Sequence, residues 1–207
     1  MTVIIGVNQG TSLLICADKR RSDLMNGYYT DDAVKIYELN NNILLALAGN
    51  VAVTDVLIRN LKIEEDKTID EVISYIRSEV NLCLSIAREK ALKGFKGKKK
   101  WYQRIFYRPS PEEQEYLDNV IDVAYILAGF DSSKSRVLYK FTSENQFQEQ
   151  LQPVNSPAII GSGQDKVEEF FLNKKPSIYS LTLCEQAIAY ASKHCKQVSA
   201  KTYHKKM

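Results

Sequence analysis

The sequence predicts an α+β fold in which two mainly antiparallel sheets pack face to face between helical layers, a four-layer αββα sandwich. Two observations predict it. Apolar, β-branched runs come in pairs that are joined by turn residues, and helical patterns come in pairs after each block of strands. With 207 residues, 44% of them hydrophobic, the chain can bury a sizeable core. We expect a single domain over residues 1–207.

Three β-hairpins are expected. Asn8-Gln9-Gly10, three asparagines at 40–42 and the segment DSSKS supply residue types that favour tight turns. A further short strand, at residues 156–160, runs into Gly161-Ser162-Gly163. The paired strands are residues 2–7 with 11–17, 33–39 with 43–48, and 120–130 with 136–142.

Helical periodicity begins after Gly49, where apolar residues recur every three or four positions. A longer helix is expected to begin at a capping box formed by Thr68 and Glu71, and its apolar stripe continues for about five turns. A third helix follows the Gly-Ser-Gly segment. Thr182 and Glu185 predict a second capping box at the start of the last helix.

Two segments do not fit the sandwich pattern. Residues 90–118 contain glycines, prolines and a basic run, which predicts an inserted and largely exposed excursion. The tail from about residue 200, AKTYHKKM, is polar and basic and is expected to be mobile.

Composition limits the function classes. The formal net charge of +3 is too small to indicate a nucleic-acid-binding protein. The apolar run TVIIGV is too short for a membrane span and follows no basic region, so we expect neither a signal peptide nor a membrane segment. Four widely spaced cysteines predict buried thiols in a reducing cytoplasm, and no metal site or cofactor is expected. Those cysteines are Cys16, Cys83, Cys184 and Cys195.

Chemistry at residue 2 is the main functional hypothesis from the residues themselves. A threonine hydroxyl becomes nucleophilic when a base takes its proton, and the free amine of an N-terminal threonine can be that base. A nearby ammonium group would lower the pKa of the amine further. Asp18 at the end of one strand, Lys35 on another and Thr2 would meet if the hairpins bring these strand ends together. The alternative is that each is an ordinary strand or turn residue.

Six segments, in order along the chain, carry a family resemblance: TVI at 2–4, ADKRRS at 17–22, VKIYEL at 34–39, NILLALAG at 42–49, ILAGFD at 126–131 and AIIGSG at 158–163. Together they resemble proteasome β-type subunits, within the N-terminal nucleophile (Ntn) hydrolases. The resemblance covers most of the chain and implies the Ntn hydrolase fold, hence the αββα sandwich.

The resemblance also implies a threonine peptidase and assigns residue roles. Thr2 would be the nucleophile and, through its amine, the proton acceptor; Asp18 would orient Lys35, which lowers the pKa of that amine or relays its proton. The backbone N–H of Gly49 would stabilise the oxyanion. Ser162 would support the amine end. Two further residues would bind substrate: Ser22 would hold its backbone as an added strand, and Leu47 would line an apolar specificity pocket.

The chain departs from the family pattern at two places. The segment between Asp18 and Lys35 is one residue longer than usual. Near the end of the last helix, where proteasome β subunits carry an aspartate, the chain reads Cys195-Lys196-Gln197-Val198-Ser199. A cysteine there resembles the proteolytic subunit of the bacterial two-component ATP-dependent protease. That likeness also implies that removal of Met1 is the only processing required to expose Thr2.

The sequence leaves three functions open. The first is a threonine peptidase acting on polypeptides, assembled as a homo-oligomeric ring and served by an ATP-dependent unfoldase. The second is a non-catalytic or regulatory ring subunit with the same fold. The third and least favoured uses the basic insertion around Lys98, Lys99 and Lys100 to bind nucleic acid or to dock a partner.

Overall fold

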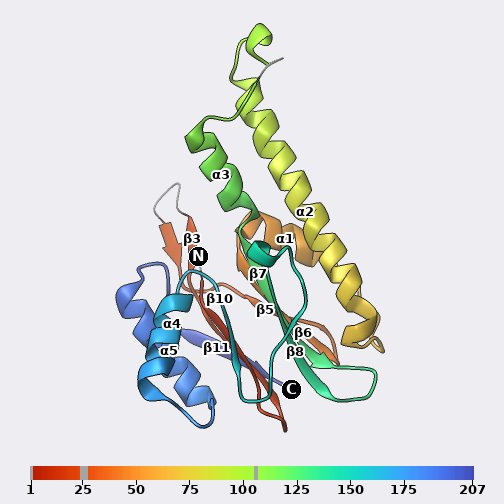
Figure 1. The fold of residues 1–207 in the computed structure, drawn as a ribbon, viewed down its shortest axis with the longest axis vertical. Helices are drawn as coiled ribbons and strands as arrows, with labels where there is room; N and C mark the ends of the chain where they lie inside the picture. Colours follow the sequence, from red (N-terminus) through yellow and green to blue (C-terminus); the bar gives the residue numbers. More distant parts are fainter. Residues whose placement is uncertain (1, 24–27, 105–106) are drawn as a thin grey trace.

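The computed structural model describes residues 2–23, 28–104 and 107–207, and Figure 1 shows how they are arranged. Within them the strands are β1 (Ile4–Asn8), β2 (Leu13–Asp18), β3 (Arg21–Asp23), β4 (Tyr28–Thr30), β5 (Ile36–Asn40), β6 (Ile43–Gly49), β7 (Val123–Phe130), β8 (Arg136–Thr142), β9 (Gln150–Leu151), β10 (Pro157–Ile160) and β11 (Thr202–Lys206). The α-helices are α1 (Val51–Asn60), α2 (Ile69–Gly97), α3 (Pro111–Ile121), α4 (Gln164–Lys174) and α5 (Leu181–His194).

Two antiparallel sheets form the centre of the molecule. One has the strand order β10-β1-β2-β11, and the other has the order β5-β6-β7-β8-β9. The three predicted hairpins are β1-β2, β5-β6 and β7-β8, and Gly10 takes the positive φ of 79° that the first turn requires. The short hairpin β3-β4 and strand β9 were not predicted, because their two or three residues are too few to show a period.

Apolar side chains form three layers. A middle cluster that includes Ile4, Ile15 and Ile126 fills the space between the two sheets. Alternate residues of β1, such as Ile5, point instead toward α4 and α5, and a third cluster joins β6 and β7 to α1 and α2. Buried apolar area on both faces of each sheet therefore produces the predicted αββα sandwich, and the predicted fold class is confirmed.

The C-terminal segment differs from its prediction. Residues 202–206 are not a mobile tail: they form β11, which pairs with β2 along its length, from Thr202 opposite Asp18 to Lys206 opposite Leu14. Its polar composition hid the strand, because β11 is a sheet edge with several side chains in solvent. Tyr203 and Met207 nevertheless pack against the cluster between the sheets.

The described residues of the basic segment at 90–118 are largely exposed, as predicted, but much of the segment is helical. Helix α2 continues to Gly97, and after a short 3-10 turn α3 returns beside it, so the two helices project beyond the sheets (Figure 1). Gly94 and Gly97 misled the prediction, because a glycine in an exposed helix weakens it without ending it.

The two predicted capping boxes have different outcomes. Glu71 accepts the backbone N–H of Thr68 at 2.9 Å, so the start of α2 is as predicted. Helix α5 begins earlier than predicted, because the hydroxyl of Ser180, not that of Thr182, accepts the N–H of Leu183. Across the part of the chain that the structure describes, every helix is too short or too polar to cross a membrane.

Candidate active site

A buried carboxylate organises the site. Asp18 is the last residue of β2 and has no exposed surface. Its Oδ1 atom accepts three hydrogen bonds: from the Thr2 hydroxyl at 2.8 Å, from the Val3 N–H at 2.8 Å and from the Lys35 ammonium at 2.7 Å. The pairing of β1 with β2 and the approach to β5 thus bring together the three residues that the sequence singled out.

Lys35 is a buried cation with one carboxylate partner. Its side chain is 9% exposed, and burial lowers its pKa below the ordinary value of 10.5, although Asp18 opposes that effect. Its carbonyl accepts the Leu47 N–H at 3.0 Å, which ties it to β6. The additional residue between Asp18 and Lys35 is therefore accommodated, because Lys35 still reaches the carboxylate.

The second oxygen of Asp18 is held by backbone groups. Its Oδ2 accepts the N–H of Arg20 at 2.9 Å and the N–H of Ser199 at 3.2 Å. The departure at residues 195–199 therefore contributes a backbone donor to the site. Ser199 itself is buried, whereas Cys195 is only partly buried.

Arg20 joins two segments around the carboxylate, a role the sequence reasoning did not assign. Its guanidinium donates to Asp31 at 2.9 Å and to the carbonyl of Lys196 at 2.8 Å. The hydrogen bond with Arg20 lowers the pKa of Asp31 and raises that of Arg20. The signal was present, because Arg20 lies within the ADKRRS segment, but its partner Asp31 comes from an unremarkable loop.

Gly161 and Ser162 adjoin Thr2 on its other side. Gly161 has a φ of 96°, and a Cβ there would lie 2.2 Å from the Thr2 carbonyl oxygen, so the close approach requires glycine. The Ser162 hydroxyl donates to that same carbonyl at 3.4 Å. Ser162 is thus beside the proposed nucleophile, and its observed contact is with the carbonyl.

A cavity of about 290 Å³ lies beside Thr2 and Lys35. Thr2, Lys35, Leu47 and Gly49 all line it, so the predicted specificity-pocket residue and the predicted oxyanion residue lie around the same cavity as the candidate nucleophile. Gly49 has a φ of 124° at the end of β6. Ser22 lies in β3, and its side chain is outside the described part of the structure, as is Met1.

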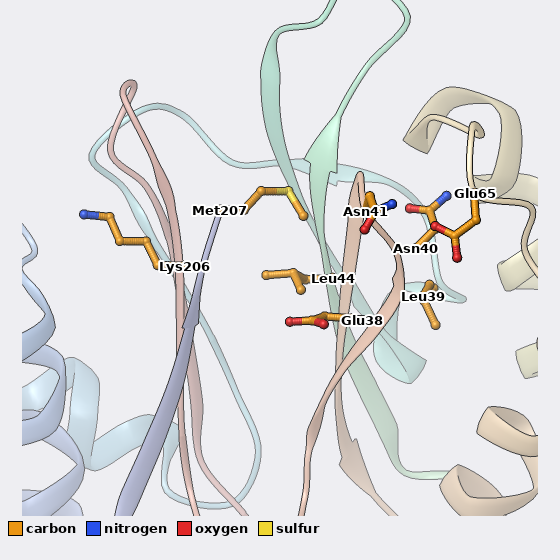
Figure 2. A pocket seen from close by; sticks show the side chains of 8 residues that line it. All are labelled: Glu38, Leu39, Asn40, Asn41, Leu44, Glu65, Lys206 and Met207. Carbon is orange, nitrogen blue, oxygen red and sulfur yellow. The ribbon is translucent and has the colours of Figure 1, made fainter.

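A larger hollow, of about 400 Å³, lies at the other end of β5, β6 and β11 (Figure 2). Its lining is mostly polar and includes Glu38, Asn40 and Glu65, and the apolar Leu44 and Met207 line it as well. The Asn40 side chain donates to the carbonyls of Glu64 and Lys67, which makes it a structural group. Among the described residues, Thr2 and Lys35 line the smaller cavity and both bond the buried Asp18 carboxylate, so the smaller cavity is the candidate active site.

The comparisons with known proteins show what the sequence and the fold are similar to. The family model for proteasome subunits matches residues 2–83, the segment that supplies Thr2, Asp18, Lys35 and Gly49. The chain therefore combines an αββα sandwich with the N-terminal sequence pattern of proteasome subunits. The likeness to proteasome-type Ntn hydrolases, expected from the motifs, is confirmed.

Two solved structures are similar over nearly the whole chain. Eukaryotic HslV from Trypanosoma brucei has 12% sequence identity and a TM-score of 0.58, with 99% of this chain and 98% of that chain covered. Anbu, the ancestral β-subunit from Yersinia bercovieri, has 10% identity and a TM-score of 0.68, with 99% and 81% covered. At these identities the likeness shows a shared fold. A search of curated proteins gave no significant match.

Proposed function

We propose that the protein is a proteasome-type threonine peptidase subunit that hydrolyses peptide bonds through Thr2. The observation that carries the proposal is one shared oxygen: Asp18 Oδ1 accepts both the Thr2 hydroxyl and the Lys35 ammonium, beside a cavity. A buried cation, a buried carboxylate and a hydroxyl meeting at one atom make up the proton network that a threonine nucleophile needs.

The first chemical step follows from these positions. Once Met1 is removed, the amine of Thr2 takes the proton from its own hydroxyl, and the oxygen attacks the substrate carbonyl. The Lys35 ammonium lowers the pKa of this amine, which has a reference pKa of about 7.7–8.0, so more of it is neutral at cellular pH. Asp18 keeps Lys35 charged and in place.

The later steps complete the cycle. Gly49 N–H would donate to the oxyanion, an interaction whose loss typically costs about 100- to 1000-fold in rate. The protonated amine passes its proton to the departing amine of the substrate as the scissile C–N bond breaks, which leaves an ester on Thr2. Water then attacks that ester while the same amine accepts its proton; the ester C–O bond breaks, the amine returns the proton to the Thr2 oxygen, and the freed acid leaves. Leu47 would contact an apolar substrate side chain next to the cleaved bond, and Ser22 in β3 would hold the substrate backbone as an added strand.

Assembly and partners are proposed from the likeness to HslV. We propose a homo-oligomeric ring in the cytoplasm that encloses its sites, with an ATP-dependent unfoldase to deliver polypeptides in extended form. A non-catalytic ring subunit is the alternative, and the family likeness supports either. The complete set of contacts at Asp18 favours the peptidase, because a chain that had lost catalysis would not need to keep a buried lysine that is costly to desolvate.

Intact-mass analysis after treatment with a leucine-containing peptide vinyl sulfone tests the proposal. The expected result is a chain that lacks Met1 and carries one adduct. Thr2→Ala should carry none, and Thr2→Ser should still react. Thr54→Ala is the matched control, because the Thr54 hydroxyl lines the same cavity and donates to Val51 O, outside the Asp18 cluster. Retention of Met1 with no adduct in the native host would support the non-catalytic subunit instead.

A further inference from the structure

The C-terminal strand contacts the backbone of the lysine strand. The hydroxyl oxygen of Tyr203, on β11, accepts the backbone N–H groups of both Lys35 and Ile36. These two residues stand at the start of β5, which is the outer strand of the second sheet. Tyr203 therefore crosses from the edge of one sheet to the edge of the other.

β11 also adjoins the carboxylate. Thr202 is the register partner of Asp18, and the carbonyl of Lys201 accepts the N–H of Lys19 at 2.9 Å. Tyr203 thus extends from a strand that is fixed directly against β2. Tyr203 therefore links β11, which pairs with the strand of Asp18, to Lys35 and Ile36 at the start of β5.

The Lys35 backbone is fixed from two sides. Its carbonyl accepts the N–H of Leu47 in β6, and its N–H donates to Tyr203. Burial raises the pKa of Tyr203 to about 12, so the phenol stays neutral and offers its lone pairs as an acceptor at ordinary pH. Because the Lys35 backbone is held in this way, its Cα has a fixed position from which the side-chain ammonium bonds Asp18.

We propose that Tyr203 is a positioning residue: by binding the Lys35 and Ile36 N–H groups, it keeps the Lys35 ammonium on Asp18 and within reach of Thr2. The proposal rests on the proposed function for its catalytic consequence, but the positioning itself is independent of turnover. The charged groups that act on Lys35 are Asp18, Asp31 and Arg20, and Tyr203→Phe alters none of them.

Amide hydrogen exchange by NMR on the full-length protein tests the positioning directly. In Tyr203→Phe, the amides of Lys35 and Ile36 should exchange about tenfold faster, which is the effect of losing one hydrogen bond. The amide of Leu45, in the core of β6, should keep its wild-type rate. Tyr190→Phe is the matched control, because it removes a tyrosine hydrogen bond to Glu169 on the outer helices. Unchanged exchange at both Lys35 and Ile36 would overturn the proposal.

The rate of adduct formation with the peptide vinyl sulfone tests the catalytic consequence. Tyr203→Phe should react about tenfold more slowly, and the pH at which half of the maximal rate is reached should rise, because the Thr2 amine loses a fixed ammonium neighbour. Tyr190→Phe should keep the wild-type rate and midpoint.

Lys205→Ala separates positioning from strand docking, because Lys205 bonds Glu38 at 2.6 Å between the same two strands. An equal loss of rate in Lys205→Ala would overturn the positioning role. So would a Tyr203→Phe variant with the wild-type rate and midpoint. A wild-type protein without Met1 that forms no adduct would instead contradict the peptidase proposal, and hydrogen exchange would still decide the role of Tyr203.

Discussion

A lysine–carboxylate ion pair lies near each end of β5, and the two pairs have opposite settings. At one end, the Lys35 side chain is 9% exposed and that of Asp18 is not exposed. At the other end, Lys205 and Glu38 form an ion pair of similar length, but their side chains are 43% and 59% exposed. Glu38 lines the larger hollow (Figure 2), whereas Lys35 lines the smaller cavity.

This difference is the reason that burial of the ion pair, more than cavity volume, identifies the candidate site. A pair in water interacts weakly because the solvent screens it, whereas a buried pair persists only if the fold supplies further hydrogen bonds. Asp18 receives those bonds from the backbone N–H groups of Val3, Arg20 and Ser199 and from the Thr2 hydroxyl. Several segments of the chain therefore donate hydrogen bonds to this one carboxylate.

Removing the two carboxylates in turn should give the largest difference in stability between the two ends of β5. Asp18→Ala leaves Lys35 buried without its partner, and we expect the free energy of unfolding to fall by about 3–5 kcal/mol. Glu38→Ala should lower it by at most about 1 kcal/mol, because Lys205 remains in water. Urea denaturation followed by circular dichroism measures both. Equal losses would show that the two ends do not differ in the way proposed.

Glycine substitutions should give the next largest effect. In Gly49→Ala the new Cβ would lie 2.4 Å from the Asp122 carbonyl oxygen at a φ of 124°. The backbone strain alone costs about 1–3 kcal/mol, so the unfolding free energy should fall by at least that amount. Gly94→Ala is the control, because its Cβ meets nothing within 4 Å in α2 and should add up to about 1 kcal/mol. A neutral Gly49→Ala would contradict the requirement for glycine at the cavity.

The pH dependence of adduct formation should reveal the buried lysine. The rate should rise as the Thr2 amine loses its proton, at a pH below the reference range of about 7.7–8.0. It should fall again when Lys35 loses its charge, and because burial lowers the pKa of Lys35, that fall should come below pH 10.5. Lys140→Met is the control: the pKa of Lys140 is also lowered by burial, but Lys140 lies on β8, and the profile should not change. A rate that stays level up to pH 10.5 would contradict the role of Lys35.

The projecting hairpin should give the smallest effect on stability. Residues 88–108 hold nine of the 28 Lys and Arg residues, and Trp101, in the 3-10 turn between α2 and α3, is 75% exposed. The double variant Lys98→Ala, Lys100→Ala should change the unfolding free energy by no more than about 0.5 kcal/mol. Fluorescence anisotropy with a labelled single-stranded oligonucleotide at physiological salt should show no binding. Binding that the double variant abolishes would favour the nucleic-acid hypothesis.

Much of the architecture could be predicted because it depends on local pattern. The three hairpins follow from turn residues between apolar runs, and the start of α2 follows from Thr68 and Glu71. The predicted start of α5 was wrong, because both Ser180 and Thr182 can cap a helix and the sequence alone does not show which of them does. Strand β11 was missed because an edge strand with exposed charged residues has no apolar period.

The sequence alone identifies four residues of the candidate site: Thr2, Asp18, Lys35 and Gly49, which lie in segments that resemble one family. The tertiary structure shows how these groups meet: it adds the backbone N–H of Arg20, two residues after Asp18, and brings in Ser199 and Tyr203 from much later in the chain. The physical reason is that a buried charge must be satisfied by whichever donors the fold brings near. The spacing of apolar residues predicts which face of a helix or strand is buried, but it does not predict which distant backbone group will lie beside a buried charge.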